Sequence, residues 1–227
     1  MRSMRAASWC TRSLPSLTCS IGSRCHIKKA LRAAEQDRPD VARHRRHWQV
    51  WQRFMESTSL VFLDESGVST NMARRCGWGQ KGERLVDAVP HGHWKTTTLV
   101  AGLKASGVIA PFVLDGPMTG EAFRAYVEEV LAPELAPGEV VVMDNLAVHK
   151  VKGVKEAIRA VGASVLHLPS YSPDLNPIEQ FFAKLKALLR RTAARTKEAL
   201  WEAIGRHLDD FTPEECRNYL AHCGYQP

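Results

Sequence analysis

Val140-Val141-Val142-Met143-Asp144-Asn145 is a run of four apolar residues that ends on an aspartate and an asparagine. A short apolar run that is rich in β-branched residues is typical of a strand buried on both faces. Apolar residues then recur at helical spacing between positions 151 and 161, and another strand-like run follows at 165–168. A strand, a crossover helix and a second strand predict a parallel pair in a sheet covered by helices.

The same alternation extends outward from this stretch. An apolar run at 60–63 predicts a strand that ends on the acidic pair Asp64 and Glu65. Residues 96–103 and 108–114 predict a β-hairpin, and 123–131 predict an amphipathic helix. The order β, β-hairpin, α, β, α, β, α predicts an α/β fold, with a mixed five-stranded sheet and helices on both of its faces.

The sequence predicts that the chain consists of three regions. Residues 1–27 are rich in Arg, Ser and Cys and have no acid, so we expect a disordered terminus, with a transit peptide or a basic arm as alternatives. Residues 28–56 predict a helical linker, and residues 57–227 form the main domain, which ends in helices. One face of the linker helix is predicted to carry Val41, Trp48, Trp51 and Met55.

Composition narrows the possible classes of protein. The 227 residues are 44% hydrophobic, enough for a sizeable core, and no stretch approaches the length of a membrane span. The net charge is +7, yet residues 1–34 hold seven basic side chains and no acid, which leaves 24 basic and 24 acidic residues in 35–227. Total charge therefore does not predict nucleic-acid binding. The six cysteines form no C-x-x-C pair, which disfavours zinc at Cys216, His222 and Cys223 and favours reduced thiols in the cytosol.

Two acidic residues follow central strands of the predicted sheet. Asp64 and Asp144 each come directly after an apolar run. Ligands gather at the carboxyl ends of parallel strands, so we expect both carboxylates at one edge of the sheet. The alternative is that each aspartate only stabilises a turn, a common role after a strand.

Glu179 is the third candidate acid. Asn176 as N-cap, Pro177 and Glu179 resemble the capping box of a helix that continues to Leu189, and capping alone explains Glu179. That helix would also begin near the edge where the two aspartates arrive. Three carboxylates there would repel one another unless cations neutralise them, and Mg²⁺ prefers such oxygen ligands.

Three strings of sequence carry a resemblance to a known family. They are Phe62-Leu63-Asp64-Glu65-Ser66, then Val142-Met143-Asp144-Asn145 with His149 four residues on, and Pro169-x-Tyr171-Ser172-Pro173-x-Leu175-Asn176-Pro177-Ile178-Glu179. Over residues 28–225 the chain resembles the DDE transposases of the mariner superfamily, specifically the bacterial insertion-sequence 630 branch. The 34 residues between Asp144 and Glu179 are similar to the gap in that family.

This resemblance implies an RNase H-like fold in which Asp64, Asp144 and Glu179 are the catalytic residues and the metal ligands. It implies two Mg²⁺ ions, for which Mn²⁺ can substitute, and cleavage and strand transfer of double-stranded DNA at transposon ends and target. It further implies a homodimer on DNA in the bacterial cytoplasm, associated with the nucleoid. Asn145, His149 and Asn176 are possible accessory residues.

One departure from the family is large, because residues 1–27 do not resemble the helix-turn-helix modules that precede the catalytic domain in its members. A split, frameshifted or truncated gene would explain this difference, and an upstream-encoded helix-turn-helix protein is then a candidate partner. Two alternatives to a transposase stay open. One is another RNase H-like nuclease that does not join ends, and the other is an inactive DNA-binding fragment.

The segment 180–197 holds six basic residues and no acid. A basic helix face is often only solvated, but this one follows Glu179 directly, so contacts with DNA phosphates are expected. The residues expected to make them are Lys184, Lys186, Arg190 and Arg191. His149 could contact a phosphate or orient a metal ligand, whereas a hydrogen-bonded structural role is the alternative.

Overall fold

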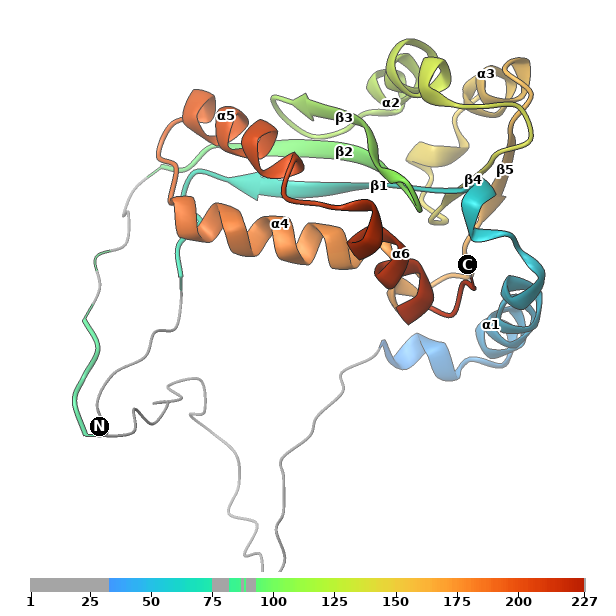
Figure 1. The fold of residues 1–227 in the computed structure, drawn as a ribbon, viewed down its shortest axis with the longest axis horizontal. Coiled ribbons are helices and arrows are strands. Elements are labelled where there is room, and N and C mark those ends of the chain that lie inside the picture. The colour runs from blue at the N-terminus through green and yellow to red at the C-terminus, as the bar shows by residue number, and fades with distance from the viewer. Residues whose placement is uncertain (1–32, 75–81, 87, 89–92, 227) are drawn as a thin grey trace, which may run out of the picture.

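The computed structural model describes residues 33–74, 82–86, 88 and 93–226. Residues 1–27 and the first part of the linker lie outside these ranges. The sheet consists of β1 (Leu60–Ser69), β2 (Thr96–Lys104), β3 (Gly107–Leu114), β4 (Val140–Met143) and β5 (Ser164–His167). The strand order is β3-β2-β1-β4-β5, with antiparallel pairs on the β3 side and parallel pairs on the β5 side (Figure 1). The predicted mixed five-stranded sheet is confirmed.

Helices cover both faces of the sheet (Figure 1). The α-helices of the described residues are α1 (Pro39–Trp51), α2 (Gly120–Tyr126), α3 (Val154–Ala160), α4 (Ile178–Thr192), α5 (Lys197–Leu208) and α6 (Pro213–His222), and α2 to α6 are the ones that cover the sheet. Alternate side chains of a strand point to opposite faces, so Phe62 packs with α4, α5 and α6, whereas Leu63 packs with α2 and α3. No helix among the described residues is long and apolar enough to cross a membrane.

Strand β1 is longer than the sequence predicts. It continues through Asp64 and Glu65 to Ser69, because these residues pair with the antiparallel strand β2, and Asp64 lies opposite Ala101. The parallel pairing with β4 ends earlier, at Leu63 opposite Met143. The prediction that Asp64 follows the end of its strand is therefore wrong, but Asp64 and Asp144 both come one residue after the last parallel pair.

The linker helix is shorter than predicted, and one of its expected core residues is exposed. In α1, Val41 is buried and Trp48 packs against the core, as does Met55 beyond the helix. Trp51 is 59% exposed and stacks on His47, with 5.9 Å between ring centroids. Trp51 is the last residue of the helix, three positions after Trp48, and this spacing turns its side chain by about 60° from the Trp48 direction, to the margin of the buried face.

The helix predicted at 123–131 has an irregular second half. Helix α2 begins at Gly120, where the Thr119 hydroxyl accepts a hydrogen bond from the Ala122 amide. After Tyr126 the chain widens into a π-helical turn, Val127–Leu131. Phe123 and Leu131 are both fully buried in the core cluster that also contains Leu63 of β1 and Met143 of β4.

Candidate active site

Two aspartates lie at the edge where the parallel pair of β1 and β4 ends. Asp64 is only 8% exposed, and its two oxygens accept hydrogen bonds from the Asn176 side-chain amide and the Glu65 main-chain amide, each at 2.8 Å. The Asp144 Oδ1 accepts a hydrogen bond of 3.0 Å from the Leu146 amide. Asp144 therefore stabilises the turn after its strand, which was the alternative to a functional role. It also lines the same cavity as Asp64.

His149 lies between two carboxylates beneath this edge. Its ring is fully buried, with Nε2 at 2.7 Å from Glu65 Oε2 and Nδ1 at 2.7 Å from Asp144 Oδ1. Burial lowers the pKa of the ring, but the two acids outweigh it and raise the pKa to about 10. The Phe123 ring packs against it at 4.6 Å between centroids. The fully buried ring contacts both acids and is not exposed to a phosphate.

Asn176 does not cap the helix that begins beside it, so the predicted capping box is wrong. Helix α4 begins at Ile178 with Pro177 in the cap position, and no side chain caps it. Asn176 instead donates its amide to Asp64, which lies 112 positions away in the sequence. Its own Oδ1 is buried and has no hydrogen-bond partner among the described residues. Glu179 is exposed on the first turn of α4 and is free of a capping role.

The three predicted acids line one cavity of about 390 Å³. Its wall consists of Asp64, Asp144, Asn145, Leu146, Leu168, Pro169, Ser170, Tyr171, Ser172, Pro173, Asn176 and Glu179. Burial is the main cause that raises the pKa of Asp64 to about 7, and the nearby charges of Asp144, Glu65 and Glu179 contribute to the increase, while the hydrogen bond from the Glu65 amide opposes it.

The donor atoms around this cavity fit a divalent cation of the magnesium type. Carboxylate oxygens are ligands that such ions prefer, and Asp64, Asp144 and Glu179 place them on the wall of the cavity. Within the described ranges, no three His, Cys, Asp or Glu side chains are arranged to hold a metal ion. The residues therefore suit Mg²⁺ in chemistry, while their side chains do not converge on one point in this structure.

The basic residues of α4 differ from one another in their contacts. Lys184 donates to the Asp210 carbonyl at 2.9 Å and to Glu215 at 2.6 Å, and its ammonium group lies 4.5 Å from the centroid of the Phe211 ring. This side chain joins α4 to α6. Lys186 and Arg190 are half-buried and Arg191 is exposed. The DNA contacts expected of Lys184, Lys186, Arg190 and Arg191 stay predictions, and the ammonium group of Lys184 already has partners within the protein.

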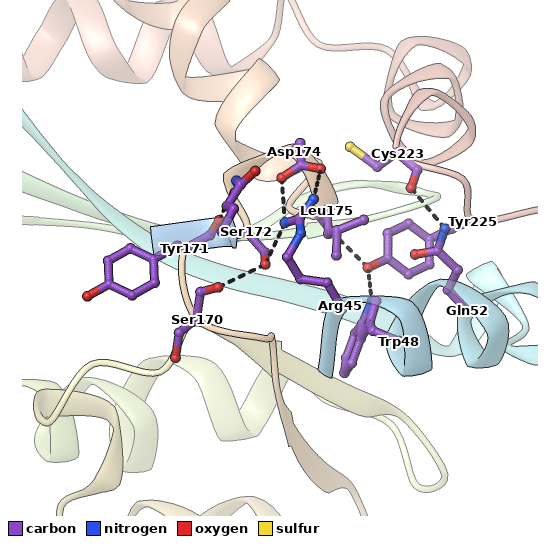
Figure 2. Close-up of polar contacts among 11 residues, drawn as sticks. Arg45, Trp48, Gln52, Ser170, Tyr171, Ser172, Asp174, Leu175, Cys223 and Tyr225 are labelled. Atoms are coloured by element: carbon purple, nitrogen blue, oxygen red, sulfur yellow. Dashed lines mark hydrogen bonds and ion pairs between the residues drawn. The ribbon is translucent and has the colours of Figure 1, made fainter. Parts of the chain in front are cut away.

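The loop between β5 and α4 has contacts that the sequence does not predict. The Asn145 amide donates to the Ser170 hydroxyl at 3.3 Å, which connects the loop to the end of β4. Tyr171 adopts a left-handed conformation with φ of 56°, which is uncommon for a residue with a side chain. Arg45 of α1 binds Ser172 and Asp174 of the same loop (Figure 2). No local pattern marks Arg45, because Asp174 is 129 positions away.

This sheet order, with two aspartates at the end of its central parallel pair, defines an RNase H-like α/β domain. Residues 59–201, more than half of the chain, match the family described as DDE superfamily endonuclease, and the chain belongs to this family. Among curated proteins, none matches this chain.

Solved structures of Mos1 transposase have a similar fold. The Mos1 paired-end complex with the left transposon end is 20% identical with a TM-score of 0.57, and the similarity covers 88% of this chain and 68% of that one. The pre-cleavage Mos1 transpososome is 18% identical with a TM-score of 0.58, covering 91% and 69%. The mariner Mos1 paired-end complex with Mg is 19% identical with a TM-score of 0.57, covering 91% and 69%.

Proposed function

We propose that this chain is the catalytic domain of a transposase of the bacterial insertion-sequence branch, which cleaves DNA strands and joins them to a target. The observation that carries the proposal is that Asp64, Asp144 and Glu179 line one cavity at the end of the central parallel pair of strands. The family match and the similar fold of transposase–DNA complexes support it. A homodimer acting on DNA in the cytoplasm is part of the proposal.

In this mechanism Asp64 and Asp144 would be the first ligands of Mg²⁺, and Glu179 would complete the site for a second ion. When bound there, a pair of such ions would supply the activation of a water or a 3′-hydroxyl and the stabilisation of the leaving oxygen. Asn176 holds the Asp64 carboxylate in place by its 2.8 Å hydrogen bond. His149 contacts both Asp144 and Glu65 at 2.7 Å, so the buried ring restrains the position of the Asp144 carboxylate.

The nature of the products tests the proposal. With double-stranded DNA that carries the inverted-repeat ends of the element, and with Mg²⁺ or Mn²⁺, we expect cleaved strands whose 3′-ends are then joined to a target duplex. Chelation by EDTA should abolish both products, and renewed Mg²⁺ should restore them. Cleavage without any joined product would favour an RNase H-like nuclease instead, and metal-independent cleavage would contradict the proposed site.

The outer face of α4 is proposed to bind DNA phosphates through Lys186, Arg190 and Arg191. We expect the double substitution Arg190→Ala and Arg191→Ala to weaken binding and to flatten its salt dependence, by about 0.9 in the log-log slope for each phosphate that the variant no longer neutralises. Titrations of duplex DNA at several salt concentrations measure this slope. The matched control removes the same charge from exposed positions of α3, on the opposite face of the sheet, by Lys155→Ala and Arg159→Ala. Equal slopes for the two double variants would contradict the assignment.

A further inference from the structure

The loop that carries Asn176 is held from outside by helix α1. The Arg45 guanidinium donates to the Ser172 hydroxyl at 2.7 Å and to both Asp174 oxygens at 2.9 and 2.7 Å (Figure 2). The Arg45 side chain is only 13% exposed, and this contact lowers the pKa of Asp174. A bidentate contact between Arg and a carboxylate is among the stronger hydrogen-bonded arrangements in proteins, and it fixes the orientation of the two groups as well as their distance.

Further contacts from the same part of the chain hold main-chain carbonyls on either side of this pair. The Gln36 side-chain amide donates to the Tyr171 carbonyl at 2.6 Å. The Trp48 indole donates to the Tyr225 hydroxyl at 2.9 Å, and that hydroxyl donates to the Leu175 carbonyl at 2.8 Å (Figure 2). Tyr171 has its unfavourable left-handed backbone at this point, and such a conformation persists only where the surroundings enforce it.

The end of α1 also fits closely against the carboxyl-terminal turn. The Gln52 side chain is buried, and its amide lies 3.4 Å from the Cys223 carbonyl. Gly224 has φ of 91°, and a Cβ atom there would lie 2.4 Å from Gln52 Nε2. The contact therefore needs glycine at this position. It joins α1 to the turn that carries Tyr225, so α1 and the loop form one packed unit.

We propose that Arg45 is a positioning residue for the candidate active site. By holding Ser172 and Asp174 it fixes the short loop that ends in Asn176, and Asn176 in turn holds the buried Asp64 carboxylate. The role of Asp64 in this inference rests on the proposed function. Ordering of the loop before the substrate binds removes an entropic cost from the reaction, because a metal ligand must be held within a fraction of an ångström to act well.

The side-chain amide of Asn176 reports this effect directly. In nuclear magnetic resonance spectra of the full chain, we expect Arg45→Ala to shift the ¹H–¹⁵N signals of the Asn176 side-chain amide. The hydrogen exchange of this amide should become at least about tenfold faster, because the substitution removes the hydrogen bonds that hold the loop to a charged group. Arg45→Lys keeps the charge without the bidentate geometry, so its exchange rate should lie between those of the wild type and Arg45→Ala. The affinity for Mn²⁺ should fall by about tenfold, the lower end of the range for residues that support metal ligands.

Arg43→Ala is the matched control, because Arg43 is an exposed arginine of the same helix and no hydrogen bond or ion pair joins it to the loop among the described residues. If the Asn176 signals and the Mn²⁺ affinity are the same in Arg45→Ala as in Arg43→Ala, the proposal is wrong. Should Arg45→Ala fail to fold, Asp174→Asn weakens the same contact at an exposed position and must give the same shift in the Asn176 signals. A wild-type chain that neither cleaves DNA nor binds Mn²⁺ would refute the proposed function, and the Asn176 signals would still decide whether Arg45 fixes the loop.

Discussion

Replacement of Asp144 by asparagine is expected to reduce Mg²⁺-dependent DNA cleavage by at least about 10³-fold. Asparagine has nearly the same size and can still accept the hydrogen bond from the Leu146 amide, so the turn after β4 should persist. The charge that this substitution removes is the one that a divalent cation needs, and metal stabilisation of the transition state contributes several kcal/mol, at about 1.36 kcal/mol for each tenfold change in rate. Single-turnover cleavage rates at saturating Mg²⁺ measure the effect.

The control for this prediction is Asp209→Asn, at the end of α5. Asp209 is exposed and lies outside the cavity, so its variant should cleave DNA at the wild-type rate. Urea unfolding of both variants separates a loss of chemistry from a loss of fold, since Asp144 is also the partner of the buried His149. Cleavage by Asp144→Asn at a rate close to that of Asp209→Asn would exclude Asp144 as a metal ligand.

Much of the sheet could be predicted because its strands are short, apolar and bounded by turn residues. The four apolar residues of β4 and the hairpin of β2 and β3 are local signals, and the structure has them at nearly the predicted positions. The length of β1 was not a local signal. Its second half is a strand only because β2 pairs with it, so the sequence alone placed Asp64 at a strand end that does not exist.

The errors at the candidate site have a common physical cause. Asn176 has the residue type and the spacing of a helix cap, whose side-chain oxygen would accept a hydrogen bond from the first turn of the helix. In the fold its side-chain amide donates to the Asp64 carboxylate, 112 positions away, and its oxygen accepts no hydrogen bond from the described residues. In the same way, the basic pattern of residues 180–197 does not predict that Lys184 forms an ion pair with Glu215 of α6. Local patterns describe which residues could interact, whereas the tertiary fold decides which partners lie within reach.

Helix α4 carries Glu179, so its attachment to the sheet should matter for both stability and activity. Phe181 is fully buried, and its ring centroid lies 5.1 Å from that of Phe182 and 4.6 Å from that of Phe211. We expect Phe181→Ala to lower the free energy of unfolding by about 3–5 kcal/mol, because the substitution removes buried apolar surface and leaves a cavity. Urea unfolding followed by circular dichroism measures this change.

Phe54→Ala is the matched control, since it deletes the same side chain where 84% of it is exposed, and it should change the free energy of unfolding by no more than about 0.5 kcal/mol. A decrease below about 1 kcal/mol in Phe181→Ala would mean that α4 is not packed as described, because large decreases accompany truncation in a well-packed core. Phe181→Leu separates stability from function, as it fills most of the space. If the packing of α4 against the sheet fixes the position of Glu179, a variant that loosens α4 should also cleave less DNA. We therefore expect Phe181→Leu to cleave a larger fraction of DNA than Phe181→Ala, even at temperatures where both variants are fully folded.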